Sequence, residues 1–290
     1  MNLGRDRIWT PEIWTAIDEA VKSAVGRVRV AQKVFPTASM PSALAVPADQ
    51  LDPETRGLIE GSTKPFIELS LSFPLTESQA QNEATELSGL KLARFWARAV
   101  ALAEDALIFQ GKDAPIPDGV NVSNLGSAET GLQGLARHVI AVGTSAPQYP
   151  ENVFEAVAEG IAKLVDAAHP GPYALIMESS VFADLHRVQQ VTRSGALITI
   201  ADRVTALVPG GFYPTGTLLS KRGVAYAQDG PVRTGLLVSL GGDPTLIYVG
   251  VDATTAFTQS DPTGLLHFRV FERFQFTALD GSAFVRFEFR

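Results

Sequence analysis

The spacing of apolar residues predicts a helix near the N-terminus, followed by a long irregular segment. Between Ile13 and Val28, apolar residues recur every three or four positions, which places them on one face of an α-helix. Thr10 and Pro11 precede this stretch and suit the N-cap and the first turn. Residues 34–66 contain five prolines and are too long for an ordinary connection within a domain. This segment is therefore either disordered or an extended arm that becomes ordered against a neighbouring chain.

A strand and the longest predicted helix follow this segment. Apolar and polar residues alternate over 66–73, which is typical of a half-buried strand. Helical spacing then runs from Gln81 to Gln110, and Gly111 follows in a position that favours a helix end. We expect Gly89 to divide this stretch into a short and a long helix. Glu104-Asp105 lies off the apolar face and is expected to be a solvated or salt-bridged part of the helix surface.

The rest of the chain changes from helices to strands. Helices are predicted at 151–168 and 180–191, with a short buried strand at 173–177 between them. Apolar runs predict further strands, and a hairpin turn is expected at 241–244. The further strands are expected at 204–208, 217–220, 235–240, 245–251, 265–276 and 283–289. Because helices and strands do not alternate regularly along the chain, we predict an α+β fold.

The composition points to a protein whose surface is largely covered by other copies of itself. Of the 290 residues, 46% are hydrophobic and 19% are charged, yet charged residues interrupt every apolar run before it can span a bilayer. Such a chain is expected to hide apolar surface in an oligomer. The net charge of −7 argues against a general nucleic-acid binder, and the N-terminal residues lack the apolar segment of a signal peptide. We therefore expect a cytoplasmic oligomer with no membrane partner and no specific nucleic-acid partner.

Residues for catalysis and metal binding are scarce. The chain has no cysteine, which excludes disulfides, thiolate catalysis and iron–sulfur clusters. The four histidines are far apart in the sequence, and no nucleophile-elbow or phosphate-loop motif occurs. We therefore expect no catalytic residue and no metal site. A soluble enzyme with an unrecognised site is the weakest of the alternatives.

Four segments, in the same order, resemble segments of the encapsulin shell proteins, the linocin or bacteriocin family. The first is a Phe-Pro-Leu-Thr sequence that leaves an Ile-Glu-Leu strand, and the second is the Glu-Asp-containing end of the long helix. The third is a Gly-Pro-Tyr sequence at the start of a strand, and the fourth joins two strands near the C-terminus. These segments lie within 66–76, 103–111, 171–175 and 248–276.

The resemblance implies the HK97-type fold of phage major capsid proteins. Its parts would be an N-terminal helix and arm, an E-loop that pairs with the neighbouring subunit, a P-domain with a spine helix, an A-domain, and C-terminal strands that return to the P-domain. In this sequence they would correspond to 1–36, 37–72, 73–135, 136–232 and 233–290.

The function that the resemblance implies is self-assembly. About sixty copies, or a multiple, would close an icosahedral nanocompartment in the cytoplasm of a bacterium or an archaeon. Proteins of this family enclose a cargo enzyme by binding its targeting peptide, and small molecules pass through pores in the shell. The cargo would be a peroxidase, a ferritin-like protein or a hemerythrin-like protein. The main alternative is a phage or prophage major capsid protein, which has the same fold and packages DNA.

The resemblance also assigns residues to particular sites. The groove for the cargo peptide would be lined by Ile13, Trp14, Ile17 and Val21. The loop that rims the five-fold pore would comprise Gln189, Gln190, Thr192, Arg193, Ser194 and Gly195. A ring of Arg193 side chains would favour anions if they point inward, and would not if they point outward. Some members bind a flavin against a tryptophan; Ser78 occupies that position here, so the resemblance carries over no cofactor.

Overall fold

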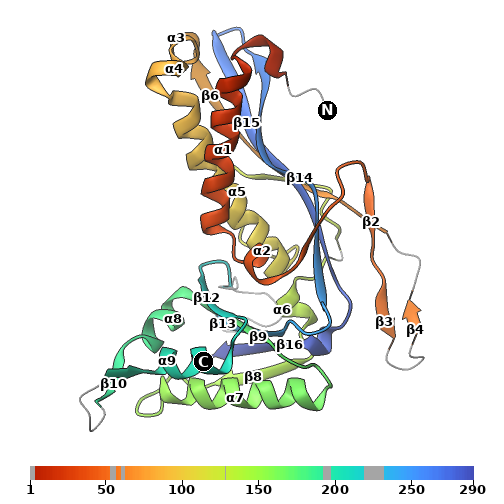
Figure 1. Ribbon diagram of the computed structural model, residues 1–290, viewed down its shortest axis with the longest axis vertical. Coiled ribbons are helices and arrows are strands. Elements are labelled where there is room, and N and C mark those ends of the chain that lie inside the picture. The colour runs from red at the N-terminus through yellow and green to blue at the C-terminus, as the bar shows by residue number, and fades with distance from the viewer. Residues whose placement is uncertain (1–3, 53–56, 60–62, 128, 192–196, 219–231) are drawn as a thin grey trace.

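Two hydrophobic cores and a narrow arm make up the computed structural model (Figure 1). It describes residues 4–52, 57–59, 63–127, 129–191, 197–218 and 232–290. The first core lies at the top of the view, the second lies at the bottom, and the arm projects to one side. Within these residues, no helix is both long and apolar enough to cross a bilayer.

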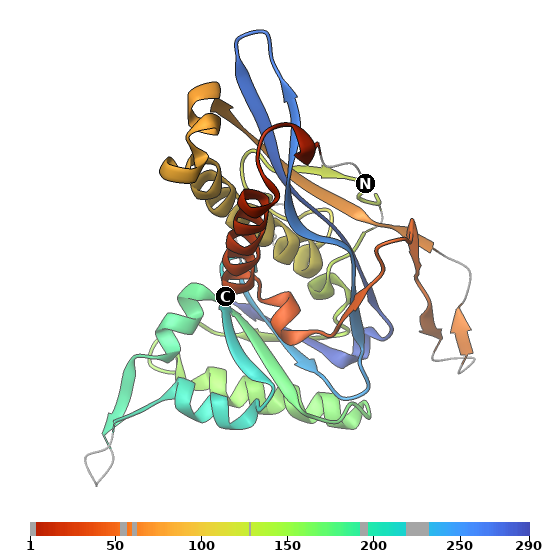
Figure 2. The ribbon, with the colours of Figure 1, turned by 45° about the horizontal axis from the view of Figure 1, so that its top comes forward.

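A five-stranded sheet and two long helices form the first core. The strand order is β1-β14-β15-β6-β7, and only the β1–β14 pair is parallel. Helices α1 (Pro11–Val28) and α5 (Ser88–Gln110) lie side by side against this sheet (Figures 1 and 2). The predicted N-terminal helix and long helix are thus confirmed. The strands are β1 (Thr37–Ser39), β6 (Ile67–Thr76), β7 (Asn121–Ser123), β14 (Thr245–Ser260) and β15 (Leu265–Ala278).

A second five-stranded sheet, in the order β12-β9-β13-β16-β8, forms the second core. Its strands are β8 (His138–Val142), β9 (Tyr173–Glu178), β12 (Gly211–Thr215), β13 (Arg233–Ser239) and β16 (Phe284–Phe289). The helices packed on it are α7 (Glu151–Asp166), α8 (Ser179–Leu185) and α9 (Ile200–Leu207). The chain crosses from the second sheet to the first between β13 and β14, and it returns between β15 and β16.

The proline-rich segment forms the arm, which is a narrow ladder of short strands. Strand β2 (Ala45–Pro47) pairs with β5 (Thr63–Pro65), and β3 (Gln50–Asp52) pairs with β4 (Gly57–Ile59). The arm extends away from both cores (Figure 2). Of the two interpretations of this segment, the described residues support the extended arm. The strand predicted at 66–73 continues it into the first core as β6.

The remaining elements are short and connect the larger ones. They are η1 (Arg5–Arg7), α2 (Ala31–Val34), α3 (Glu77–Gln81), α4 (Glu83–Glu86), α6 (Leu132–Leu135), β10 (Val188–Val191), β11 (Leu197–Thr199) and η2 (Gly281–Ala283). The break before the long helix lies at Leu87, whose φ is 54°, and not at Gly89 as predicted. Gly89 is instead inside α5, where a Cβ would lie 2.5 Å from the Trp9 ring.

Four local predictions are wrong. Residues 204–207, predicted as part of a strand, belong to α9, because Thr199 and Asp202 form a capping box that starts a helix. The helix predicted over 180–191 ends at Leu185, and 188–191 form β10, which pairs with β11. The turn at 241–244 joins two different sheets and is therefore no hairpin. Thr217 and Leu218 are not in a strand, and 219–220 lie outside the described residues.

Candidate functional site

The apolar face of α1 packs on the first core. Trp14, Ile17 and Val21 are 3%, 1% and 0% exposed, and Ile13 lies partly buried at the edge of the same core. The expectation that Trp14, Ile17 and Val21 line an open groove therefore needs correction, because other parts of the same chain already cover these side chains. Of the four predicted residues, Ile13 is the one that a peptide could contact without displacing the helix.

Aromatic side chains anchor the N-terminal end of α1. The Trp9 ring stacks on Phe268 of β15 with a centroid distance of 4.6 Å, and it meets the Trp14 ring edge-on at 4.8 Å. Both indole nitrogens donate hydrogen bonds to backbone carbonyls, Trp9 to Ala80 at 2.8 Å and Trp14 to Arg5 at 2.9 Å. This end of the helix is held by packing and by satisfied polar groups together.

An arginine–aspartate pair fastens the middle of α1 to β14. Arg5 donates to both carboxylate oxygens of Asp18 at 2.7 and 2.8 Å, the paired geometry that makes such contacts strong. Asp18 also accepts a hydrogen bond from the Thr254 hydroxyl at 2.8 Å, and Arg5 donates to the Thr255 carbonyl. Residues before and within α1 are therefore tied to the same strand.

A buried cluster of charges anchors the C-terminal end of α1. Arg29 forms ion pairs with Glu104 of α5 and Glu272 of β15, and with Asp252 of β14 at 3.0 Å. Asp105 accepts hydrogen bonds from the backbone N–H groups of Val30 and Ala31 at 2.7 and 2.9 Å. The sequence interpretation of Glu104-Asp105 was right about salt bridging and wrong about solvation, since both residues are 0% exposed. We name Arg29, Glu104, Asp105 and Glu272 the buried charge cluster.

One face of α5 presents apolar side chains to the surroundings. Phe95 is 58% exposed and Leu102 is 37% exposed, and the ring of the partly buried Trp96 meets the Phe95 ring edge-on at 4.8 Å. The exposed cations Lys91, Arg94 and Arg98 flank them. We name Phe95 and Leu102, with these three cations, the outer face of α5. The sequence analysis missed this face, although two large apolar residues outside the predicted apolar stripe are a usable signal.

The pore-loop residues are only partly described. Gln189 and Gln190 lie in β10, which forms an antiparallel hairpin with β11 that projects from the second core (Figure 1). Thr192, Arg193, Ser194 and Gly195 lie outside the described residues.

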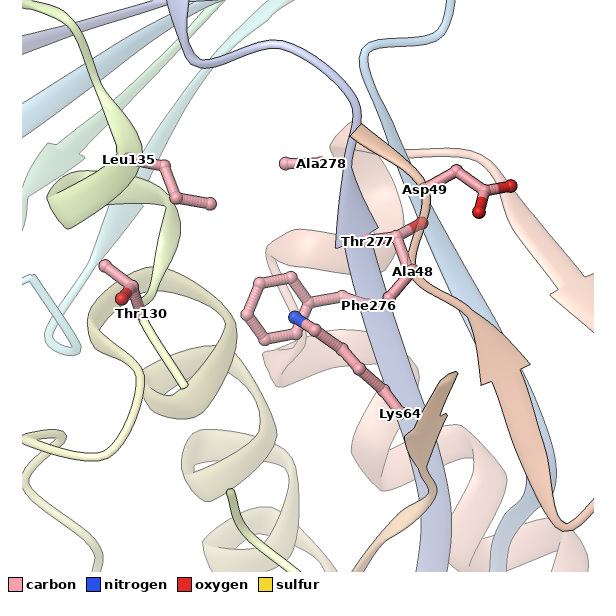
Figure 3. A pocket seen from close by; sticks show the side chains of 8 residues that line it. All are labelled: Ala48, Asp49, Lys64, Thr130, Leu135, Phe276, Thr277 and Ala278. Carbon is pink, nitrogen blue, oxygen red and sulfur yellow. The ribbon is translucent and has the colours of Figure 1, made fainter. Parts of the chain in front are cut away.

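A cavity of about 130 Å³ separates the base of the arm from the body of the protein (Figure 3). Lys64 crosses it, with its Nζ 2.7 Å from a carboxylate oxygen of Glu129 and 5.5 Å from the centre of the Phe276 ring. Beside it, the Gln275 amide donates to the Pro65 carbonyl at 2.8 Å. These contacts hold the base of the arm. The cavity is lined by Ala48, Asp49, Lys64, Thr130, Leu135, Phe276, Thr277 and Ala278.

One histidine lies beside both a hydroxyl and a carboxylate, the groups of a catalytic triad. His169 Nε2 lies 2.8 Å from the Ser282 hydroxyl and 3.3 Å from an Asp280 oxygen. Both partners thus face the same ring nitrogen, whereas a catalytic triad requires the carboxylate at the other one. Among the described residues, no group of three His, Cys, Asp or Glu side chains could hold a metal ion.

The position that binds a flavin in some relatives offers no stacking surface. Ser78, where the resemblance places a tryptophan, is exposed on α3 and supplies only a hydroxyl. A nearby hollow of about 370 Å³ has no aromatic residue in its described lining, which is Ile8, Glu77, Ala80, Gln81, Ser260, Gly264 and Leu266. The residues at this place do not fit a stacked isoalloxazine ring.

Comparison with known families shows which family the chain belongs to. A family model described as an encapsulating protein for peroxidase matches residues 8–275. The chain belongs to this encapsulin shell family. The resemblance noted in the sequence is thereby confirmed, and this family is one of structural shell proteins.

Individual relatives are distant. The type 1 encapsulin shell protein EncA of Myxococcus xanthus is 29% identical over 127 residues, which are 43% of this chain and 42% of EncA. The match thus spans less than half of that encapsulin. The virus-like particle from Pyrococcus furiosus has a TM-score of 0.66 at 15% identity, covering 96% of this encapsulin chain and all of the other.

Phage capsids share the fold. The capsid protein of Myoviridae phage XM1 has a TM-score of 0.57 at 11% identity, covering 91% of this chain and 92% of that one. The predicted HK97-type α+β fold is therefore confirmed. Because these likenesses to solved structures concern the fold alone, it is the family model that separates this encapsulin from the phage proteins.

Proposed function

We propose that the chain is a non-catalytic subunit that assembles with copies of itself into a closed icosahedral shell around a cargo enzyme. The family match over residues 8–275 carries this proposal. The arm supports it, because Leu44 is 83% exposed and Ile59 is 57% exposed, and a neighbouring subunit would remove these side chains from water. In this proposal about sixty copies, or a multiple, close the shell in the cytoplasm of a bacterium or an archaeon.

The parts of the chain then take different roles in the shell. The first core acts as the P-domain, the arm as the E-loop, and the second core as the A-domain near the symmetry axes. The β10–β11 hairpin, with Gln189 to Gly195, rims a pore through which small molecules pass. If the Arg193 side chains point inward, the pore favours anions, and Arg193→Glu is then expected to reverse this preference in the entry of charged dyes into sealed shells; if they point outward, neither effect is expected.

The cargo is a peroxidase or another enzyme that carries a targeting peptide, and the peptide binds near the N-terminal helix. Trp14, Ile17 and Val21 support that helix from within the core. Ile13 and the outer face of α5 supply accessible apolar contacts, with Lys91, Arg94 and Arg98 around them. This division assigns anchoring to the buried residues and recognition to the accessible ones.

The test of assembly is electron microscopy of the chain expressed alone. Uniform closed particles are the expected result. A small discrete oligomer would overturn the shell, and particles that protect nuclease-resistant DNA would replace the enzyme compartment with a DNA-packaging capsid.

The test of loading uses a fluorescent protein fused to the tail of a peroxidase encoded beside the shell gene. Ile13→Glu and Phe95→Glu are expected to reduce co-purifying fluorescence at least about tenfold, because a charge in an apolar contact opposes binding. Val165→Glu is the matched control, since Val165 is likewise an apolar helix residue, 57% exposed, on α7 of the second core. Full loading of both variants would show that the peptide binds elsewhere.

A further inference from the structure

The buried charge cluster contains more acid than base. Arg29 supplies one positive charge, and its side chain is 7% exposed. Glu104, Asp105 and Glu272 can supply three negative charges, and their exposure is 0%, 0% and 1%. The cluster would therefore carry two uncompensated negative charges if every carboxyl group were ionised. Uncompensated charge in a protein interior is costly, because no water or partner replaces the lost hydration.

The hydrogen bonds identify where the excess falls. One oxygen of Glu272 pairs with Arg29, and the other, Oε1, is buried without a hydrogen-bond partner. Glu104 pairs with Arg29 and accepts a hydrogen bond from the Gln32 amide at 2.6 Å. Asp252 also faces the cluster and is the further charged group found there in the part of the chain that the structure describes; it lies at the rim, with a side chain that is 49% exposed. It competes for the same guanidinium and adds further negative charge.

The pKa values of the three carboxyl groups agree with this excess of negative charge. Burial, partly opposed by Arg29, raises the pKa of Glu272 well above its usual value. Burial also raises the pKa of Glu104, although Arg29 and Gln32 oppose the change. For Asp105, burial and repulsion from Glu104 raise the pKa to about 7, although the hydrogen bonds that it accepts from two backbone N–H groups act in the opposite direction.

We propose that the junction between α1 and α2 is a proton-dependent latch, in which the single guanidinium of Arg29 holds the junction on α5 and β15 most tightly while the carboxyl groups around it retain a proton. Arg29 follows the last residue of α1, and the N–H groups bound by Asp105 belong to the next two residues. Glu104 and Glu272 thus fix the end of one helix through Arg29, and Asp105 fixes the start of the next.

The direction of the pH response follows from linkage. When the junction opens to water, the carboxyl groups return to their ordinary pKa values of 3.8 for Asp105 and 4.5 for Glu272. At pH values between these ordinary pKa values and the raised pKa values of the closed state, the closed state therefore binds more protons than the open state. The stability of the closed state is full below this window and falls as the pH rises through it. For Asp105 the window runs from 3.8 to about 7, and for Glu272 it begins at 4.5.

Hydrogen–deuterium exchange of the purified full-length chain tests the latch. After correction for the intrinsic pH dependence of exchange, peptides covering 25–34 are expected to open more with rising pH, by up to about tenfold per pH unit for each linked proton. Peptides from β9, inside the second core, serve as the internal reference. Equal pH responses in the two regions would overturn the proposal without any variant.

A glutamine substitution separates the latch from general pH effects. Glu272→Gln keeps an oxygen for Arg29 and removes one of the three carboxyl groups whose pKa is raised, so the rise in exchange with pH is expected to become smaller. The matched control is Glu129→Gln, because Glu129 is also buried but pairs with Lys64, outside the cluster. An unchanged pH response in Glu272→Gln would contradict the proposal.

The consequence for cargo rests on the proposed function. In mild acid the α1–α2 junction would be held more firmly, so α1 would be held more firmly where the cargo peptide binds. The two proposals fail separately. Shells whose junction shows no pH response would contradict only the latch, whereas a responsive junction in a chain that forms no shells would contradict only the compartment.

Discussion

At the scale of single residues, two backbone segments approach each other closely at the end of α5. Gly111 ends this helix with a φ of 66°, a conformation that residues with a side chain rarely adopt. A Cβ at this position would lie 2.4 Å from the Glu129 carbonyl oxygen and 2.5 Å from the Gly131 nitrogen. Glycine is therefore required here by both conformation and space.

Alanine substitutions at two glycines are expected to act in opposite directions. Gly111→Ala should lower the free energy of unfolding by about 1–3 kcal/mol or more, because it adds backbone strain and a clash with backbone atoms. Gly26→Ala should raise it by about 0.5–1 kcal/mol, since Gly26 lies within α1 and a Cβ there meets nothing within 4 Å. Chemical denaturation of the two variants measures the difference. A neutral Gly111→Ala would show that the two segments can move apart.

Removing the guanidinium of the buried charge cluster should be among the most damaging single changes. Arg29→Met keeps much of the side-chain volume but leaves Glu104 and Glu272 without their cation, which is expected to cost about 3–5 kcal/mol. Arg98→Met, on the exposed face of α5, is the matched control and should stay within about 0.5 kcal/mol of the wild type. Thermal denaturation followed by circular dichroism compares the two. Similar midpoints for both variants would mean that the cluster contributes little net stability.

At the scale of elements, the spacing of apolar residues predicted the long helices well but did not predict which of their charged residues are buried. Thr10, Pro11 and the apolar repeat were enough to predict α1, because a proline in the first turn and one buried face are local features of that helix; Thr10 precedes it without a side-chain capping hydrogen bond. The repeat in α5 did not reveal that Glu104 and Asp105 are buried. Their partners, Arg29 and the N–H groups of Val30 and Ala31, lie about 75 residues earlier in the chain, and periodicity carries no information about such distant contacts.

The strands near the C-terminus also depend on distant contacts that the sequence pattern does not reveal. The apolar runs of β15 and β16 predicted strands, but the turn at 241–244 resembled a hairpin because it separates two apolar runs. Which sheet each run joins depends on pairing with β9 and β15, and that is decided by the tertiary structure. The Thr199–Asp202 capping box was a local signal for α9 that the sequence analysis could have used.

The base of the arm is expected to depend on one lysine. Lys64→Met retains an apolar stem beside Phe276 but leaves the buried Glu129 without this ion pair, so hydrogen exchange in β2 and β5 should become faster. Lys64→Arg keeps the charge and should restore most of the protection. Peptides covering 45–47 and 63–65 report the change, with β9 as the reference. Unchanged protection in Lys64→Met would assign the anchoring to Gln275 and the backbone.

At the scale of the whole molecule, an arm that extends beyond both cores suits assembly by contacts between different surfaces (Figure 2). Such contacts give either a closed particle or an open filament, depending on the rotation between neighbours. The family segments were enough to identify the shell family from the sequence. The apolar residues of α1 were not enough to identify a cargo site, because core packing and ligand contact produce the same apolar pattern on a helix.

A charge on the arm should separate assembly from folding. Leu44→Asp places a carboxylate at a side chain that is 83% exposed in the subunit, so the fold should be unaffected while the yield of closed particles falls at least about tenfold. Ser42→Asp, two residues away and also exposed, is the control and should assemble normally. Size-exclusion chromatography with light scattering measures the yield. Normal particles from Leu44→Asp would remove this residue from the interface.

The order of strands in the second sheet has a consequence for protein synthesis. Strand β16 (Phe284–Phe289) lies between β13 and β8, yet in chain order it follows the other four strands of this sheet. A chain that stops before Phe284 has β12, β9 and β13 on one side of a gap and β8 on the other. The second sheet therefore cannot close before Phe284–Phe289 has been synthesised.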